Sequence, residues 1–517
     1  MLQHIVYICG ATQFDLARHA LERMRASEVG EAGAHRACYI LTHKLLGSLK
    51  LQVNVLSDLD IIGSHLRENP VDLLIYDERG EGAVPALRAI QRIRADVQAL
   101  ADSWGPDFNF PMSRVVAILG EKGKSRRVFE LGRMNVRDVC TDPKSLSALL
   151  LWLKDVLWHG ILREQKIGVA LGGGGIEGFL YEIGVLAALE GAFEEGTSLR
   201  KCDVISGVSS GAIAGALFAS KIPIHEVIKS LRKRSGMLPP LTSSTIFDLA
   251  ATDISKRFLK QGIAWKGLDP KRWIDMTLKS VPTGFFKGER MEEYIRTALE
   301  VGGHKDSFDD IEPELLIGAT NADSFEHVTF GCAPHDKVAI SEAIRASVAL
   351  PPVFLPKKIG KHWYIDGQVT KSCDLDMVVE RGCRLVVVVN PLKPFASHIP
   401  GMAEEEGGLF STIQTIKALV STRFEQTLKS SAERYPDVDF IVFEPDEECA
   451  ELMAGSPMRY RIRTQLIRMA FSHTLRKLRE RHHVYAVKFG KYGLNLRSAA
   501  ELKKLESDYA EIFESTT

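Results

Sequence analysis

Ser209 lies at the centre of a pentapeptide, Gly207-Val208-Ser209-Ser210-Gly211, that fits the G-x-S-x-G pattern of a serine nucleophile. The strand-like run CDVIS precedes it and the helix-forming AIAGALFAS follows it. We therefore expect the serine at a sharp turn from a strand into a helix, where small neighbouring residues let the two elements approach closely. Ser209 is a candidate nucleophile, and an ordinary Gly-Ser turn is the alternative.

A glycine-rich segment, GGGGIEG at residues 172–178, follows another predicted strand. Gly173, Gly175 and Gly178 fit the dinucleotide-binding pattern G-x-G-x-x-G. A dinucleotide site needs an acidic residue at the end of the next strand, whereas that strand ends here on the serine turn. The N–H groups of Gly173, Gly174 and Gly175 are therefore candidates for an oxyanion hole at a helix N-terminus. A nucleotide-binding loop and a structural turn are the alternatives.

Asp366 and Gly367, within HWYIDGQV, form the third element. Its carboxylate is a candidate proton acceptor, but Asp-Gly between apolar residues is also a common hairpin turn. The three elements, with an A-S-x-x-x-P-x-x-F-x-P-like segment at residues 346–356, occur in the order found in patatin-like phospholipases. Residues 166 to about 395 resemble that family, and the strand RLVVVVNP after the Asp-Gly pair also fits it.

This resemblance implies a three-layer α/β/α catalytic domain with a Ser-Asp dyad of Ser209 and Asp366. It also assigns the oxyanion hole to the glycine loop and implies motif roles for four further glycines. These are Gly178, Gly207, Gly211 and Gly367. The expected function is lipid acyl hydrolysis of the phospholipase A or lysophospholipase type, through an acyl-enzyme and without a metal or cofactor. Phospholipid or lysophospholipid is the expected substrate.

One departure from the family pattern concerns Glu177, which stands where the family usually has Arg or Lys. A carboxylate directed at an oxyanion would oppose catalysis, so we expect the Glu177 side chain to point away, toward a basic partner. If it pointed inward, the chain would be a catalytically impaired lipid-binding or scaffold protein, which is one alternative to lipid hydrolysis. A soluble short-chain carboxylesterase is the other.

The first 160 residues alternate short apolar runs with segments of helical periodicity. Five runs predict strands of a parallel sheet covered on both faces by helices: HIVYICGA, LQVNVLS, VDLLIYD, RVVAILG and VRDVCT. This order resembles a bacterial receiver domain of flavodoxin-like α/β fold, with Asp77 at the phosphoacceptor position. Cys9, Gly120 and Asp142 stand where receivers carry an acidic metal ligand, Thr or Ser, and Lys. We therefore expect a regulatory module with a protein partner, and Asp77 as a strand-end carboxylate.

The whole chain is predicted to be an α/β protein in three parts. Residues 1–160 form the receiver-like domain, residues 161–395 the catalytic domain, and residues 396–517 a mainly helical extension packed on the catalytic domain. The 517 residues include 66 basic and 66 acidic side chains, so the net charge of zero does not favour a nucleic-acid partner. The eight scattered cysteines form no zinc-ligand pattern and fit a reducing, cytoplasmic setting.

Membrane contact is expected only at the surface, because no apolar run approaches the roughly 20 residues that span a bilayer. Two segments are candidates for peripheral contact with the inner face of the membrane. Residues 459–481 combine eight basic side chains with an apolar series, although packing of that series on the catalytic domain is the alternative. Residues 231–268 carry apolar side chains that could cover an acyl-binding cleft, or pack in the ordinary way: Met237, Leu238, Leu241, Phe247, Phe258 and Trp265.

Overall fold

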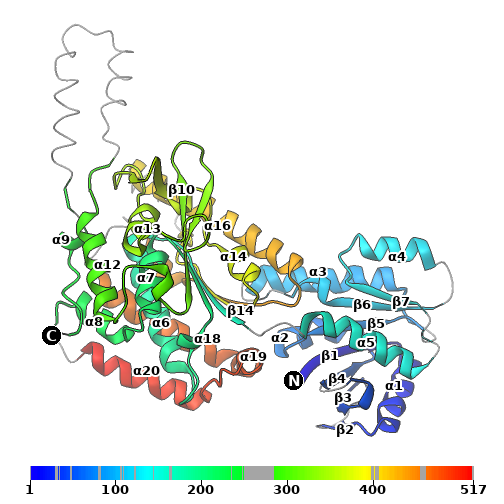
Figure 1. The fold of residues 1–517 in the computed structure, drawn as a ribbon. Coiled ribbons are helices and arrows are strands. Elements are labelled where there is room, and N and C mark those ends of the chain that lie inside the picture. Colours follow the sequence, from blue (N-terminus) through cyan, green and yellow to red (C-terminus); the bar gives the residue numbers. More distant parts are fainter. Residues whose placement is uncertain are drawn as a thin grey trace. The chain divides into compact units, whose positions relative to one another are not determined.

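The computed structural model contains two compact units (Figure 1). Unit 1 comprises residues 1–165, 427–440 and 481–496, and unit 2 comprises residues 166–426, 441–480 and 497–517. The structure describes residues 2–514 except for the following short stretches and one longer one: 30–32, 34, 47–48, 80–82, 105–107, 109, 121–123, 142, 144, 162–165, 235, 247, 250–283, 397–400, 402–406 and 455–461.

Unit 1 contains a seven-stranded sheet in the order β2-β3-β4-β1-β5-β6-β7. The five predicted strands are present and parallel: β1 (Leu2–Cys9), β4 (Lys50–Leu56), β5 (Leu73–Asp77), β6 (Val115–Leu119) and β7 (Asp138–Thr141). Their order, β4-β1-β5-β6-β7, is that of flavodoxin-like folds. The sequence did not predict the antiparallel edge formed by β2 (Ser27–Glu28) and β3 (Arg36–Thr42).

Both faces of this sheet are buried because successive side chains along a strand point to opposite faces. In β1, Ile5 and Tyr7 belong to one core with α1 (Ala11–Arg23) and α5 (Leu146–Ile161). Val6 and Ile8 belong to the other core, with three helices. These are α2 (Ile62–Glu68), α3 (Ala86–Trp104) and α4 (Lys124–Gly132). Unit 1 is therefore an α/β layer structure, as expected from its alternating strands and helices.

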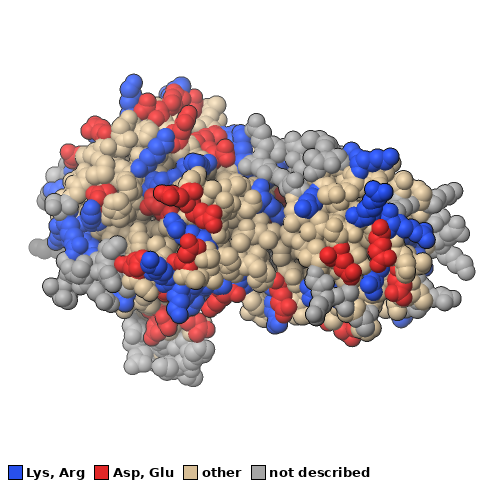
Figure 2. Space-filling view, turned by 90° about the horizontal axis from the view of Figure 1, so that it is seen from below, with Lys and Arg blue, Asp and Glu red and all other residues tan. Residues whose placement is uncertain are grey.

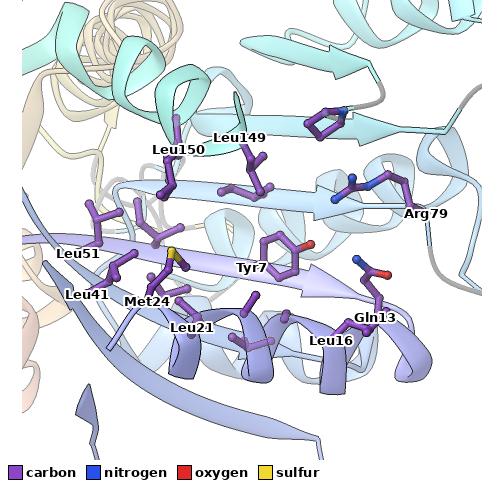
Figure 3. Close-up of a pocket in the computed structure, with 18 of the residues that line it drawn as sticks. Tyr7, Gln13, Leu16, Leu21, Met24, Leu41, Leu51, Arg79, Leu149 and Leu150 are labelled. Carbon is purple, nitrogen blue, oxygen red and sulfur yellow. The ribbon is translucent and has the colours of Figure 1, made fainter. Parts of the chain in front are cut away.

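A cavity of about 340 Å³ lies between α1, α5 and the sheet of unit 1 (Figure 3). Its walls are mainly aliphatic, and Tyr7, Gln13 and Arg79 lie toward one end. Asp77 is buried close by, where it accepts hydrogen bonds from the Tyr7 hydroxyl and from Arg79, whose Nη2 is 2.7 Å from Oδ2. The side chain of Asp77 is thus fully engaged in unit 1.

The C-terminal segments of unit 1 contact its sheet through buried charges. Arg114 Nη2 donates to Asp439 Oδ1 at 3.0 Å, and Tyr492 OH donates to the other oxygen of Asp439 at 3.3 Å. Lys491 forms an ion pair with Asp72. Residues 427–440 include the end of α16 (Gly407–Arg434), and residues 481–496 contain α19 (His482–Gly490). Segments more than 250 residues away in sequence therefore complete unit 1.

Unit 2 is built on an eight-stranded sheet in the order β12-β13-β10-β9-β8-β14-β15, with β11 paired to β10. The central strands β10 (Glu314–Asn321), β9 (Val204–Val208), β8 (Lys166–Leu171) and β14 (Cys383–Val389) are parallel. Three further strands lie on one side: β11 (His327–Phe330), β12 (Lys357–Ile359) and β13 (His362–Asp366). β11 and β13 pair antiparallel with β10, and β12 pairs antiparallel with β13. β15 (Asp439–Phe443) lies at the other edge.

Helices cover both faces of the unit 2 sheet. On one face, Leu171 of β8 contacts Gly215 of α7 (Ser210–Ala219), and on the other face Gly168 of β8 contacts Val378 of α14 (Leu375–Glu380). This is the three-layer α/β/α arrangement expected from the sequence. Further helices of the unit follow in chain order: α6 (Gly175–Ala192), α8 (Ile224–Leu231), α9 (Ser243–Ile246), α12 (Glu289–Val301), α13 (Ile340–Ser347), α17 (Glu447–Leu452), α18 (Arg463–Glu480) and α20 (Ala499–Glu514).

Acidic and basic side chains lie interspersed over most of the face shown in Figure 2, in keeping with the balanced composition. No helix within the described ranges has both the length and the apolar composition needed to cross a membrane. None of the eight cysteines forms a disulfide bond within the described residues.

Candidate active site

Ser209 lies at the turn between β9 and α7, as the sequence predicted. It is the one residue between the end of the strand at Val208 and the start of the helix at Ser210. Its backbone has φ 54° and ψ −120°, a strained conformation for a residue that carries a side chain. Its N–H donates to Ser347 Oγ at 2.8 Å, which helps to hold this conformation.

The glycines on either side of Ser209 are required by close backbone contacts. A Cβ at Gly207 would lie 2.4 Å from the carbonyl oxygen of Gly211, and a Cβ at Gly211 would lie 2.4 Å from the carbonyl oxygen of Leu171. Strand and helix thus approach too closely for any side chain at these two positions. The tight turn directs the serine side chain out of the β9–α7 junction.

Asp366 is the last residue of β13, and its carboxylate meets the serine hydroxyl. Ser209 Oγ donates to Asp366 Oδ2 at 2.6 Å, and the main-chain N–H of Gln368 donates to Oδ1 at 2.8 Å. A Cβ at Gly367 would lie 2.3 Å from the carbonyl oxygen of Gly318, so the Asp-Gly turn packs directly on β10. The structure therefore brings together two side chains that are 157 residues apart in sequence.

The Ser209–Asp366 pair is shielded from solvent. The two residues are 5% and 1% exposed. Burial raises the pKa of Asp366 to about 7, although the hydrogen bonds from Ser209 and from the Gln368 N–H act in the opposite direction. A carboxylate with a pKa near neutrality is a far better proton acceptor than an exposed aspartate.

The glycine loop lies between β8 and the N-terminus of α6. Gly172 N–H donates to the carbonyl of Val389 at 2.8 Å and so belongs to the sheet. In contrast, the N–H groups of Gly173 and Gly174 donate to no backbone carbonyl of the described residues. Gly175 is the first residue of α6, where the N–H has no partner within the helix. The loop therefore presents N–H groups at the positively polarised end of a helix, an arrangement suited to an anion.

Two residues that support the site were not singled out from the sequence. Ser347, at the end of α13, accepts the Ser209 N–H and donates to the Gly318 carbonyl at 2.6 Å. Thr320 Oγ1 donates to the Asp366 carbonyl at 2.9 Å. Ser347 lies within the 346–356 segment already noted, so that segment was the available signal, whereas nothing in the sequence marks Thr320.

Glu177 is directed toward a basic side chain, as expected from its departure from the family pattern. It is fully buried in the first turn of α6, and its Oε2 is 3.9 Å from Nζ of Lys417 on α16. Lys417 also donates to the Met453 carbonyl. The charge of Glu177 therefore faces a lysine within unit 2.

The two predicted membrane segments are only partly described. The buried residues of α18 include Leu466, Ile467 and Phe471, and this helix packs on α6, where a Cβ at Gly184 would lie 2.6 Å from the Ile467 carbonyl. The apolar side of α18 is thus used in packing. Arg459, Arg461, Phe247, Phe258 and Trp265 lie outside the described residues. The described residues contain no group of three or more His, Cys, Asp or Glu side chains that could hold a metal ion.

Two curated proteins are similar to 55% of this chain. The lysophospholipase NTE1 of Kluyveromyces lactis is 24% identical over 315 residues, which are 18% of its length. The lysophospholipase NTE1 of Saccharomyces cerevisiae is 24% identical over 314 residues, which are 16% of its length. The matched region therefore spans less than a fifth of these relatives.

Among solved structures, VipD from Legionella pneumophila matches 68% of this chain and 80% of its own, with 14% identity and a TM-score of 0.25. The family model of the patatin-like phospholipases matches residues 169–379 of this chain. These residues include Ser209, Asp366 and the glycines after Gly172. The chain therefore carries a patatin-like phospholipase domain.

Proposed function

We propose that this protein hydrolyses the acyl esters of phospholipids or lysophospholipids with Ser209 as the nucleophile and Asp366 as the base. The observation that carries the proposal is the buried 2.6 Å hydrogen bond from Ser209 Oγ to Asp366 Oδ2. The family match and the similarity to proteins named lysophospholipases support a lipid ester as the substrate. Peripheral contact with a membrane and a protein partner for unit 1 are part of this proposal, as is a cytoplasmic location.

In the first step, Ser209 Oγ attacks the ester carbonyl carbon while its proton passes to Asp366 Oδ2. The electron pair of the carbonyl bond moves to oxygen, and the N–H groups of Gly173, Gly174 and Gly175 stabilise the resulting anion. Collapse of this intermediate breaks the ester C–O bond, and the leaving alkoxide takes the proton from Asp366. An acyl-serine remains.

In the second step, Asp366 accepts a proton from water as that water attacks the acyl-serine. Collapse of the second tetrahedral intermediate returns the proton to Ser209 Oγ and releases the fatty acid. The cycle needs one group that exchanges a proton near neutral pH, and burial gives Asp366 that property.

The position of Glu177 argues against the impaired-enzyme alternative. A free carboxylate beside the glycine loop would repel the anion that forms during the reaction. Lys417 lies 3.9 Å from Glu177 and offsets its charge. The short-chain esterase alternative differs only in substrate, so the dependence of kcat/KM on acyl chain length separates it from a lipid hydrolase.

Substitution of the nucleophile tests the proposal. Ser209→Ala is expected to lower the hydrolysis of a fluorogenic ester by at least about 10³-fold and to abolish covalent labelling by a fluorophosphonate, with the thermal unfolding midpoint unchanged. Ser210→Ala removes the adjacent buried hydroxyl and is the matched control. Full hydrolysis or full labelling in Ser209→Ala would exclude the assignment.

A further inference from the structure

Gln368 places a carboxamide against the glycine loop. A Cβ at Gly173 would lie 2.2 Å from Gln368 Cδ, so the end of the glutamine side chain rests on the backbone of that glycine. Nε2 of Gln368 is buried and makes no hydrogen bond with any described residue. A hydrogen-bond donor is therefore held beside one of the candidate oxyanion N–H groups without a partner of its own.

The backbone of Gln368 is fixed at both ends. Its N–H donates to Asp366 Oδ1 at 2.8 Å, and its carbonyl accepts a hydrogen bond from Arg423 of α16. Arg423 also donates to the Val369 carbonyl at 3.0 Å. Because the other oxygen of Asp366 accepts the Ser209 hydroxyl, the same short turn positions the base and the carboxamide relative to each other.

A buried donor without a partner destabilises the folded state, since the unfolded chain would hydrogen-bond it to water. Such groups are rare in folded proteins, and each one requires an explanation. In the proposed mechanism, the N–H groups of Gly173 and its neighbours stabilise the negative charge that develops on the carbonyl oxygen of a bound ester. An acceptor for Gln368 Nε2 would then be present beside Gly173 only during the reaction.

We propose that the Gln368 side chain is a further oxyanion donor, and this inference rests on the proposed function. As Ser209 Oγ bonds to the carbonyl carbon and its proton moves to Asp366, the carbonyl electron pair moves to oxygen. Nε2–H of Gln368 then donates to that oxygen together with the glycine N–H groups. Because the charge exists only in the intermediate and its transition states, this hydrogen bond raises kcat more than it lowers KM.

Three variants of the full chain test this role. Gln368→Met keeps the length of the side chain without a donor, and Gln368→Glu replaces the donor with a carboxylate. Gln426→Met, at an exposed position of α16, is the matched control. We expect kcat for a soluble nitrophenyl ester to fall about 10²- to 10³-fold in Gln368→Met and further in Gln368→Glu, with KM changed much less.

Fluorophosphonate labelling provides a second readout, because the phosphonyl oxygen occupies the same position as the oxyanion. Its rate should fall in parallel with kcat in both Gln368 variants, and the unfolding midpoint of Gln368→Met should be equal to or above that of the unsubstituted protein. Unchanged or increased kcat and labelling in Gln368→Met would overturn the inference and show that the side chain only covers the loop. If Ser209→Ala stays active, the proposed function itself fails. If only the Gln368 variants behave as unsubstituted protein, the dyad stands without this donor.

Discussion

In the proposed mechanism Asp366 is the base, and it is also buried; together these two properties set the pH dependence of the activity. The carboxylate would have to be ionised to accept the Ser209 proton, and burial raises its pKa to about 7. We therefore predict that kcat/KM rises with pH along an acid limb with a midpoint near 7 and levels off above pH 8. Initial rates with an uncharged soluble ester between pH 5 and 9 measure this limb. A midpoint near 4, typical of an exposed aspartate, would contradict it.

Removing the charge of Asp366 should stabilise the protein while it abolishes activity. Between the unfolded pKa of about 3.9 and the folded pKa of about 7, the folded state retains a proton that the unfolded state has lost. The free energy of unfolding therefore falls as pH rises through this window. Asp366→Asn does not ionise and should be more stable than the unsubstituted protein at pH 8, by a few kcal/mol at most. Urea denaturation at pH 5 and pH 8 measures the difference, which should be clearly smaller at pH 5 and vanish only below the unfolded pKa of about 3.9.

Single residues differ in how far the sequence predicts them. The position of Ser209 was predictable because a serine at a tight strand-to-helix turn imposes glycines on its own pentapeptide, so the constraint is local. Gln368 was not, because its significance arises from contact with Gly173, almost 200 residues away in sequence. The sequence alone could not indicate that its carboxamide would be buried without a partner.

At the scale of elements, the junction of β9 and α7 depends on the close approach of the two backbones at Gly207 and Gly211, which one added methyl group would prevent. Gly207→Ala places a Cβ 2.4 Å from the Gly211 carbonyl oxygen, and the atoms that this Cβ meets belong to the backbone of Gly211 and Ala212. Strand and helix must then separate, which we expect to cost about 1–3 kcal/mol and to displace Ser209. Activity should fall at least about 10-fold together with the denaturation midpoint.

A glycine in open surroundings provides the control for this prediction. A Cβ at Gly490, the last residue of α19, would meet no atom within 4 Å, so Gly490→Ala should leave stability and activity unchanged. If Gly207→Ala and Gly490→Ala had equal stability and activity, the β9–α7 junction would tolerate a side chain. The same steric reasoning explains why this element could be predicted. The edge strand β3, an antiparallel addition to the parallel sheet, was missed.

At the scale of the whole molecule, the order of the segments along the chain differs from the way in which they group into the two units. A reading along the sequence assigns residues 396–517 to one extension, yet residues 427–440 and 481–496 group with unit 1. The contacts responsible are ion pairs and hydrogen bonds between residues more than 300 positions apart, such as Arg114 with Asp439. Helical periodicity indicates that residues 396–517 are mainly helical but carries no information about which sheet each segment completes.

Asp439 is the residue on which this grouping should depend most. It is buried among Arg114, Lys488 and Lys491, and although burial alone would raise its pKa, these cations hold the pKa of its carboxyl well below the usual range. Asp439→Asn leaves the buried cations without that charge and should lower the free energy of unfolding by about 3–5 kcal/mol at pH 7. The stabilisation by the ionised Asp439 is complete above pH 4 and is lost as the pH falls further. The difference in free energy of unfolding between the unsubstituted protein and Asp439→Asn should therefore shrink at low pH.

The neighbouring Asp437 offers a matched control, because its ion pair with Arg137 at 2.7 Å is partly exposed. Asp437→Asn should cost less than about 1 kcal/mol, since water compensates most of an exposed ion pair. Guanidinium denaturation of the full chain, followed by a probe in unit 1, measures both variants. If Asp439→Asn proved as stable as Asp437→Asn, the buried charges would not be what attaches residues 427–440 to unit 1, and apolar contacts alone would have to hold the segment there.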